Sequence, residues 1–166
     1  GLWLAGKSKL LSGPNFDRTV HVAMSTSALQ LPALFACMAS LLASTVAPQD
    51  VIIHLFMPTR AVLEHVSIVL NCTIREFGSK FGVSIRMHQI KSNQYRLLQN
   101  CSANAVANLM RFYLPELLPQ IDKVLWVDSD GLVLGDVRTL MSTLFVGEHK
   151  GTPIAAVERK EKRLEE

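Results

Sequence analysis

The chain has 166 residues, of which 49% are apolar and 19% charged, and its formal net charge is +3. This length and apolar content suffice for one globular domain with a buried core, and they exclude a disordered chain. The basic residues are dispersed rather than gathered in a stripe with aromatic residues, so no nucleic-acid partner is predicted. No apolar segment reaches the roughly 20 residues that a membrane-spanning helix needs.

Strand-like and helix-like patterns alternate along the chain between residues 19 and 157, and we treat this part as one domain. Residues 1–18 show no periodicity and are expected to be irregular, and residues 158–166 form a charged tail. The predicted strands lie near residues 20–24, 51–56, 83–87, 123–128 and 153–157. Helical spacing covers residues 32–42, 59–70, 73–81 and 103–118, and a polar loop covers 89–102. Such alternation predicts a parallel sheet with right-handed crossovers, and hence a three-layer α/β sandwich.

The acidic segment DKVLWVDSDGLVLGD, residues 122–136, holds four of the six aspartates of the chain. Its apolar run, residues 124–127, ends in Asp128 and Asp130. Carboxylates beside a buried strand are costly unless a cation or hydrogen bonds compensate them, and α/β proteins bind ligands at the carboxyl ends of parallel strands. Two such carboxylates can hold one cation, and all-oxygen ligation favours Mg²⁺ or Mn²⁺. The alternative is an ordinary strand-to-turn junction, since Asp-Gly pairs are common in turns.

The helix predicted at residues 103–118 has a polar stripe opposite its apolar face. Asn104, Asn108 and Arg111 form the stripe. A guanidinium donates to two oxygens at once and therefore suits a diphosphate, although a stripe of this kind is also typical of a solvated surface. Pro115 and Pro119 are expected to kink or end the helix.

The run NLMRFYLPELLP, followed by IDKVLWVDSDGLVLGDV, resembles glycosyltransferase family 8, whose members are retaining, nucleotide-sugar-dependent transferases. The resemblance implies a Rossmann-like nucleotide-diphospho-sugar transferase (GT-A type) fold. It implies that Asp128 and Asp130 hold Mn²⁺ (or Mg²⁺), which bridges the diphosphate of a UDP-sugar, and that the partners are this donor and a glycan, protein or lipid acceptor. Arg111, Asn108 and Ser129 are the implied donor-binding residues. It assigns no catalytic residue.

Two positions depart from the family pattern. Ser27 stands where an aspartate that meets the nucleoside is expected, which puts uridine selectivity in doubt. The family's third metal ligand is a histidine far downstream of the acidic pair, and His149 lies too close to it. We therefore expect residues 19–157 to be the N-terminal portion of a catalytic domain, truncated on its C-terminal side, with weak or no activity alone and a tendency to self-associate along its open last strand.

Two N-x-S/T sequons, centred on Cys72 and Cys101, hint at secretion, and these two cysteines could pair in an oxidising compartment. The expected location is the Golgi or another secretory-pathway lumen, or the cytoplasm if the source is not eukaryotic. Contact with a membrane is expected only through an anchor outside this chain. The buried pattern around Cys37 predicts a core residue.

Two alternative functions remain open from the sequence. In a haloacid-dehalogenase-type phosphatase, Asp128 would be the nucleophile and Asp130 the acid/base. That motif normally opens its domain, whereas only 36 residues follow Asp130 here. The second alternative is a non-catalytic, truncated transferase domain.

Overall fold

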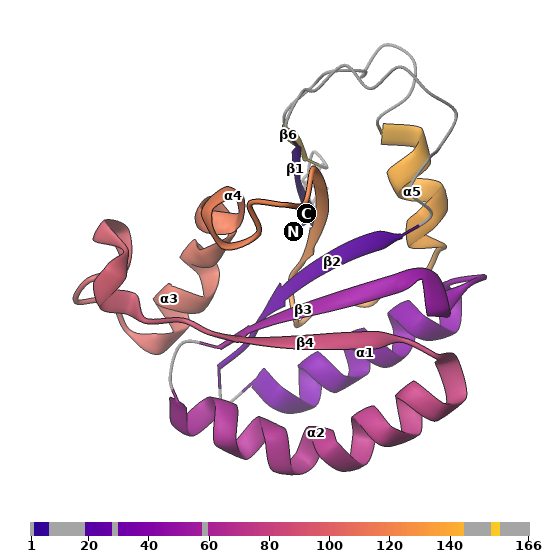
Figure 1. Ribbon diagram of the computed structural model, residues 1–166, viewed down its shortest axis with the longest axis horizontal. Coiled ribbons are helices and arrows are strands. Elements are labelled where there is room, and N and C mark those ends of the chain that lie inside the picture. The colour runs from indigo at the N-terminus through magenta and orange to yellow at the C-terminus, as the bar shows by residue number, and fades with distance from the viewer. Residues whose placement is uncertain (1, 7–18, 28–29, 58–59, 145–153, 157–166) are drawn as a thin grey trace, which may run out of the picture.

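The computed structural model describes residues 2–6, 19–27, 30–57, 60–144 and 154–156. In these residues six strands form one sheet with the order β4-β3-β2-β5-β1-β6 (Figure 1). The strands are β1 (Leu2–Gly6), β2 (Val20–Ser25), β3 (Val51–Met57), β4 (Ser84–Gln89), β5 (Lys123–Val127) and β6 (Ile154–Ala156). Strands β2 to β5 are parallel to one another, whereas β1 is antiparallel to both β5 and β6.

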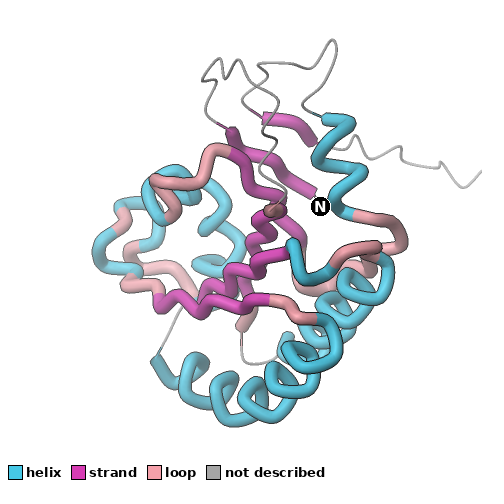
Figure 2. The backbone as a smooth tube through the Cα atoms, turned by 45° about the vertical axis from the view of Figure 1, so that its right-hand side comes forward, coloured by secondary structure: helices cyan, strands magenta, loops and turns pink. Residues whose placement is uncertain are grey.

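Helices cover both faces of the sheet, which confirms the α/β class expected from the sequence. Figures 1 and 2 show the two longest helices, α1 (Leu31–Ser44) and α2 (Arg60–Phe81), along one face. The opposite face is covered by α3 (Ala103–Leu109), the 3-10 turn η5 (Met110–Tyr113) and α4 (Leu114–Leu117). The buried side chains accordingly fall into two hydrophobic clusters, one on each face.

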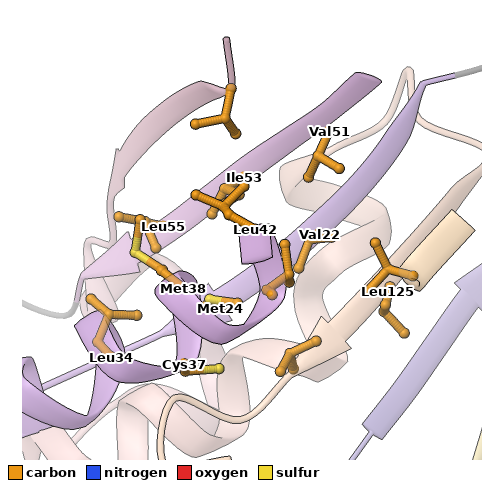
Figure 3. Close-up of a cluster of buried hydrophobic side chains, with 14 of the residues drawn as sticks. Val22, Met24, Leu34, Cys37, Met38, Leu42, Val51, Ile53, Leu55 and Leu125 are labelled. Carbon is orange, nitrogen blue, oxygen red and sulfur yellow. The ribbon is translucent and has the colours of Figure 1, made fainter. Parts of the chain in front are cut away.

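The cluster beneath α1 follows from the period-two alternation of the strands. Alternate residues of β2 and β3, such as Val22, Met24, Ile53 and Leu55, point to the same face and meet α1 (Figure 3). Pro32 lies in the first turn of α1, where its missing N–H costs nothing. Cys37 is fully buried in this cluster, as predicted. Each large aliphatic side chain buried here contributes about 1.5–3 kcal/mol.

Two expectations about the elements were wrong. Residues 2–6 are not irregular, because β1 inserts between β5 and β6 in antiparallel register. Residues 60–81 form one continuous helix, α2, which ends at Gly82 with a φ of +67°. By contrast, the last strand, β6, is an edge strand as expected, because among the described strands it pairs on one side only, with β1. The sequence left a Cys72–Cys101 pair open, and the structure has none, since all three cysteines are free thiols.

A further helix, α5 (Val137–Leu144), was not expected. Asp136 caps it, because its Oδ1 accepts a hydrogen bond from the backbone N–H of Arg138 at 3.0 Å. Val137, Leu140 and Met141 pack against the α1 cluster. The capping aspartate and this i, i+3, i+4 spacing were the signals that could have predicted the helix.

The predicted helix at residues 103–118 is broken, as the prolines indicated. Pro115 lies in the first turn of α4, and Ser102 caps α3 by accepting a hydrogen bond from the backbone N–H of Ala105 at 3.3 Å. The polar loop at residues 89–102 contains two 3-10 turns, η3 (Ser92–Gln94) and η4 (Arg96–Leu98). Among the described residues, no helix has the length and hydropathy of a membrane span.

Candidate functional site

The acidic pair lies where the sequence predicted it, at the carboxyl end of β5. Residues 128–131 form a turn, here called the acidic turn, in which the backbone N–H of Gly131 donates to the carbonyl of Asp128 at 3.1 Å. Asp130 is exposed, the side chain of Asp128 is 24% exposed, and Ser129 between them is buried. The junction is therefore a strand-to-turn junction, as the alternative interpretation held, and it also presents two carboxylates beside the open end of the parallel strands.

Arg111 of η5, one of the segments that cover the neighbouring face of the sheet, contacts this turn. Its Nη2 donates to Oδ1 of Asp128 at 3.1 Å, and its Nε donates to the backbone carbonyl of Asn108 at 2.8 Å. The guanidinium lies over the ring of Trp126, 5.4 Å from the ring centroid. The structure thus brings Arg111 and Asp128 together, although the sequence separates them by 17 residues.

The other polar residues of the predicted stripe take different places. The side chains of Asn104 and Asn108 are exposed. Ser27 follows β2 and is buried, and its Oγ donates to Oε1 of Gln30 at 3.4 Å. The donor-binding roles of Asn108, Arg111 and Ser129 stay predictions.

The electrostatics of the turn favour an ionised Asp128. Burial by itself raises the pKa of Asp128, the hydrogen bond from Trp126 and the positive charge of Arg111 lower it, and the sum of all its contacts holds the pKa below its ordinary value. Burial, with added repulsion from Asp130 and Asp128, raises the pKa of Cys37 to about 11. Cys37 is thus a neutral thiol beneath the acidic pair, and its Sγ lies 3.6 Å from the carbonyl oxygen of Asp128.

Helix α1 supports the segment that follows the turn. The backbone N–H of Val133 donates to Oγ of Ser40 at 3.0 Å, and Oγ of Ser44 donates to the carbonyl of Gly135 at 3.2 Å. Two serines one helical turn apart therefore hold an extended segment alongside the helix. This role was not expected from the sequence, although the four-residue spacing of the serines is a signal for it.

Asp128 and Asp130 are the residues that fit a divalent cation here. Hard oxygen ligands at a strand end suit Mg²⁺ or Mn²⁺. Within the residues that the structure describes, no cluster of three or more histidine, cysteine or acidic side chains has a geometry for a metal. His149 lies outside the described residues. A third protein ligand is thus not assigned.

Three histidines form a row that the sequence analysis did not detect. Nδ1 of His21 lies 3.0 Å from Nε2 of His54, and Nδ1 of His54 lies 3.0 Å from Nε2 of His88. His88 also stacks on Phe56, with 4.8 Å between the ring centroids. The row crosses β2, β3 and β4, and each imidazole is hydrogen-bonded to its neighbour.

Comparison with known proteins places the chain in a family. Residues 21–165 match the model of glycosyl transferase family 8. A probable galacturonosyltransferase 4 of Arabidopsis thaliana is 35% identical over 66 residues, which cover 40% of this chain and 11% of that protein. The chain therefore matches only a small part of this relative's length.

Two solved structures share the fold at low sequence identity. A bifunctional glycosyltransferase, WbbM, has a TM-score of 0.53 and 20% identity, over 79% of this chain and 22% of that one. Mouse xyloside xylosyltransferase 1 has a TM-score of 0.50 and 12% identity, over 76% of this chain and 48% of that one. The family match, together with the acidic turn and Arg111, favours the transferase over the phosphatase interpretation. The chain belongs to glycosyltransferase family 8.

Proposed function

We propose that this chain forms the donor-binding part of a metal-dependent hexosyltransferase that uses a UDP-sugar and retains the anomeric configuration. The observation that carries the proposal is the cluster at the end of β5. Arg111 pairs there with Asp128, 17 residues away in the sequence, and Asp130 lies exposed in the same turn. A phosphorylated ligand with a divalent cation needs both kinds of group.

The acidic residues and the arginine would bind different parts of the donor complex, according to their charge. Asp128 and Asp130 would hold the divalent cation, and the bound cation would neutralise charge on the departing diphosphate. Arg111 would donate to the diphosphate, with Asn108 and Ser129 beside it. Because Arg111 is paired with Asp128 in the present arrangement, donor binding would exchange one anionic partner of Arg111 for another. This exchange keeps the guanidinium satisfied in both states.

The retained configuration and the UDP donor rest on the family resemblance. An acceptor would attack the oxocarbenium-like sugar on the face that the diphosphate leaves. The donor sugar is open, and a galacturonosyl donor belongs among those tested because the plant relative is described as a probable galacturonosyltransferase. We also propose a secretory-pathway lumen as the location, because of the two sequons at residues 71–73 and 100–102.

The test is UDP release with Mn²⁺ by the protein as its source produces it, using UDP-hexoses and UDP-hexuronates. We expect Asp130→Ala to lower turnover at least about 100-fold, since transition-state charge stabilisation of this kind is worth several kcal/mol. Asp136→Ala is the matched control, because Asp136 caps α5 and lies outside the acidic turn. Full turnover by Asp130→Ala would rule out the metal role.

The same assay on the 166-residue chain addresses the non-catalytic alternative. We expect UDP release near background, because two aspartates alone do not build a closed, water-poor site. Robust turnover that Asp128→Ala abolishes would show that the chain is sufficient for catalysis.

A further inference from the structure

We propose that Trp126 is a positioning residue for the cation, because its indole N–H fixes the orientation of the Asp128 carboxylate. The inference rests on the proposed function, since it presupposes that Asp128 and Asp130 bind a divalent cation. Trp126 itself contacts neither the cation nor the donor in this proposal. It acts through Asp128.

The geometry joins the indole to one carboxylate oxygen. Nε1 of Trp126 donates to Oδ1 of Asp128 at 2.8 Å, and Nη2 of Arg111 donates to the same oxygen at 3.1 Å. Side chains two residues apart on a strand point to the same face, so the W-x-D spacing places the ring beside the carboxylate. The hydrogen bond is short and its acceptor is charged, which makes it one of the stronger kinds.

The ring is held firmly, so the direction of its N–H is defined. Trp126 is 1% exposed and lies in the cluster under α3 and α4, with Val106, Met110 and Leu114. Packing alone does not require an indole there, because phenylalanine or leucine would fill an apolar cluster without a polar atom. A buried tryptophan needs an acceptor for its N–H, and here that acceptor belongs to the acidic pair.

The two donors to Oδ1 differ in charge, and this difference separates their roles. Arg111 is cationic, so it competes with a divalent cation for Asp128. The indole is neutral and keeps its hydrogen bond whether or not a cation is present. Of these two donors, Trp126 is therefore the one that orients Asp128 in both states. Hydrogen-bond partners of metal ligands typically change metal affinity 10- to 100-fold when removed.

Calorimetric titration of Mn²⁺ in the presence of UDP tests the proposal on the chain and its Trp126→Phe variant. We expect about 10-fold weaker binding or more for Trp126→Phe, which keeps a ring but lacks the N–H. Phe56→Leu is the matched control, since Phe56 is fully buried in the same cluster and stacks on His88 instead. Unchanged affinity in Trp126→Phe, or an equal loss in Phe56→Leu, would overturn the inference.

A second measurement follows the indole N–H of Trp126 directly, so it does not depend on the folding of a Trp126 variant. The indole N–H resonance of Trp126 is distinguished from that of Trp3 with a Trp3→Phe variant, and Mg²⁺ with UDP is then titrated. We expect a slowly exchanging N–H whose chemical shift follows the midpoint of a calorimetric titration with Mg²⁺ and UDP. A rapidly exchanging or unshifted resonance would overturn the inference.

The two levels of failure are distinguishable. If the unsubstituted protein binds no cation, or if Asp130→Asn binds it equally well, the metal role and this inference fall together. If Asp130→Asn loses binding while Trp126→Phe retains it, the inference alone is refuted.

Discussion

Two polar clusters, the histidine row and the acidic turn, lie on the same face of the sheet. They differ in how many of their polar atoms are hydrogen-bonded to other protein atoms. In the histidine row, His54 is 1% exposed and is hydrogen-bonded on both sides by other imidazoles. In the acidic turn, Asp128 shares one oxygen between two donors, while Asp130 is exposed to solvent. The histidines are hydrogen-bonded to one another, whereas the turn exposes the charge of Asp130 to solvent.

The difference separates a stabilising cluster from a binding cluster. A buried group whose partners are all protein atoms contributes to stability, and its loss leaves those partners unsatisfied. An exposed carboxylate contributes little to stability and is available to a ligand. Substitutions in the row should therefore change the free energy of unfolding, and substitutions in the turn should change binding.

The largest expected effect on stability comes from His54→Ala. The change removes both hydrogen bonds of a buried side chain and leaves a cavity between β2 and β4, so we expect a loss of about 3 kcal/mol in the free energy of unfolding. Urea denaturation measures it. His21→Ala, at one end of the row and half-buried, is the control and should cost less. Equal costs for the two variants would show that His54 is not the centre of the row.

The second effect is a pH dependence of stability. Burial, followed by repulsion from His88, His21 and Arg86, lowers the pKa of His54 from 6.5 to about 4, and burial and Arg86 lower the pKa of His88. Below pH 6.5 the histidines bind protons in the unfolded chain but not in the folded row. Their contribution to the free energy of unfolding is therefore fully present above pH 6.5 and falls as the pH is lowered toward 4. For His54 the loss is about 3 kcal/mol at most.

Denaturation at several pH values measures this loss and separates the two clusters. The pKa of Asp128 is lowered from 3.8, so the acidic turn loses stability only below that pH. A His54→Phe variant should show a smaller slope between pH 6.5 and 4. An unchanged slope in that variant would assign the pH dependence to other groups.

The smallest expected effect on stability comes from Asp130→Asn. Asp130 is exposed, so the free energy of unfolding should change by no more than about 0.5 kcal/mol. Thermal denaturation checks this, and the same sample should lose Mn²⁺ binding. A large destabilisation would mean that the turn is structural and would erase the contrast with the histidine row.

Much of the fold could be predicted because its signals are local. The parallel strands β2 to β5 follow from apolar runs bounded by turns, and the break near Pro115 follows from the chemistry of proline. Strand β1 could not be predicted, because its apolar run became a strand only by pairing with β5 and β6. The sequence placed Arg111 in one motif and Asp128 in another, but it did not show that the two side chains are hydrogen-bonded to each other.

The sequence by itself determined the apolar periodicities, the acidic pair at the end of β5 and the capping residues, since each depends on neighbours a few positions away. Only the tertiary structure decided that Arg111 and Trp126 converge on one oxygen of Asp128. It alone aligned the three histidines, which lie 33 and 34 residues apart, on three adjacent strands. Parallel crossovers set which strands become neighbours and in what register, and no local pattern encodes that choice.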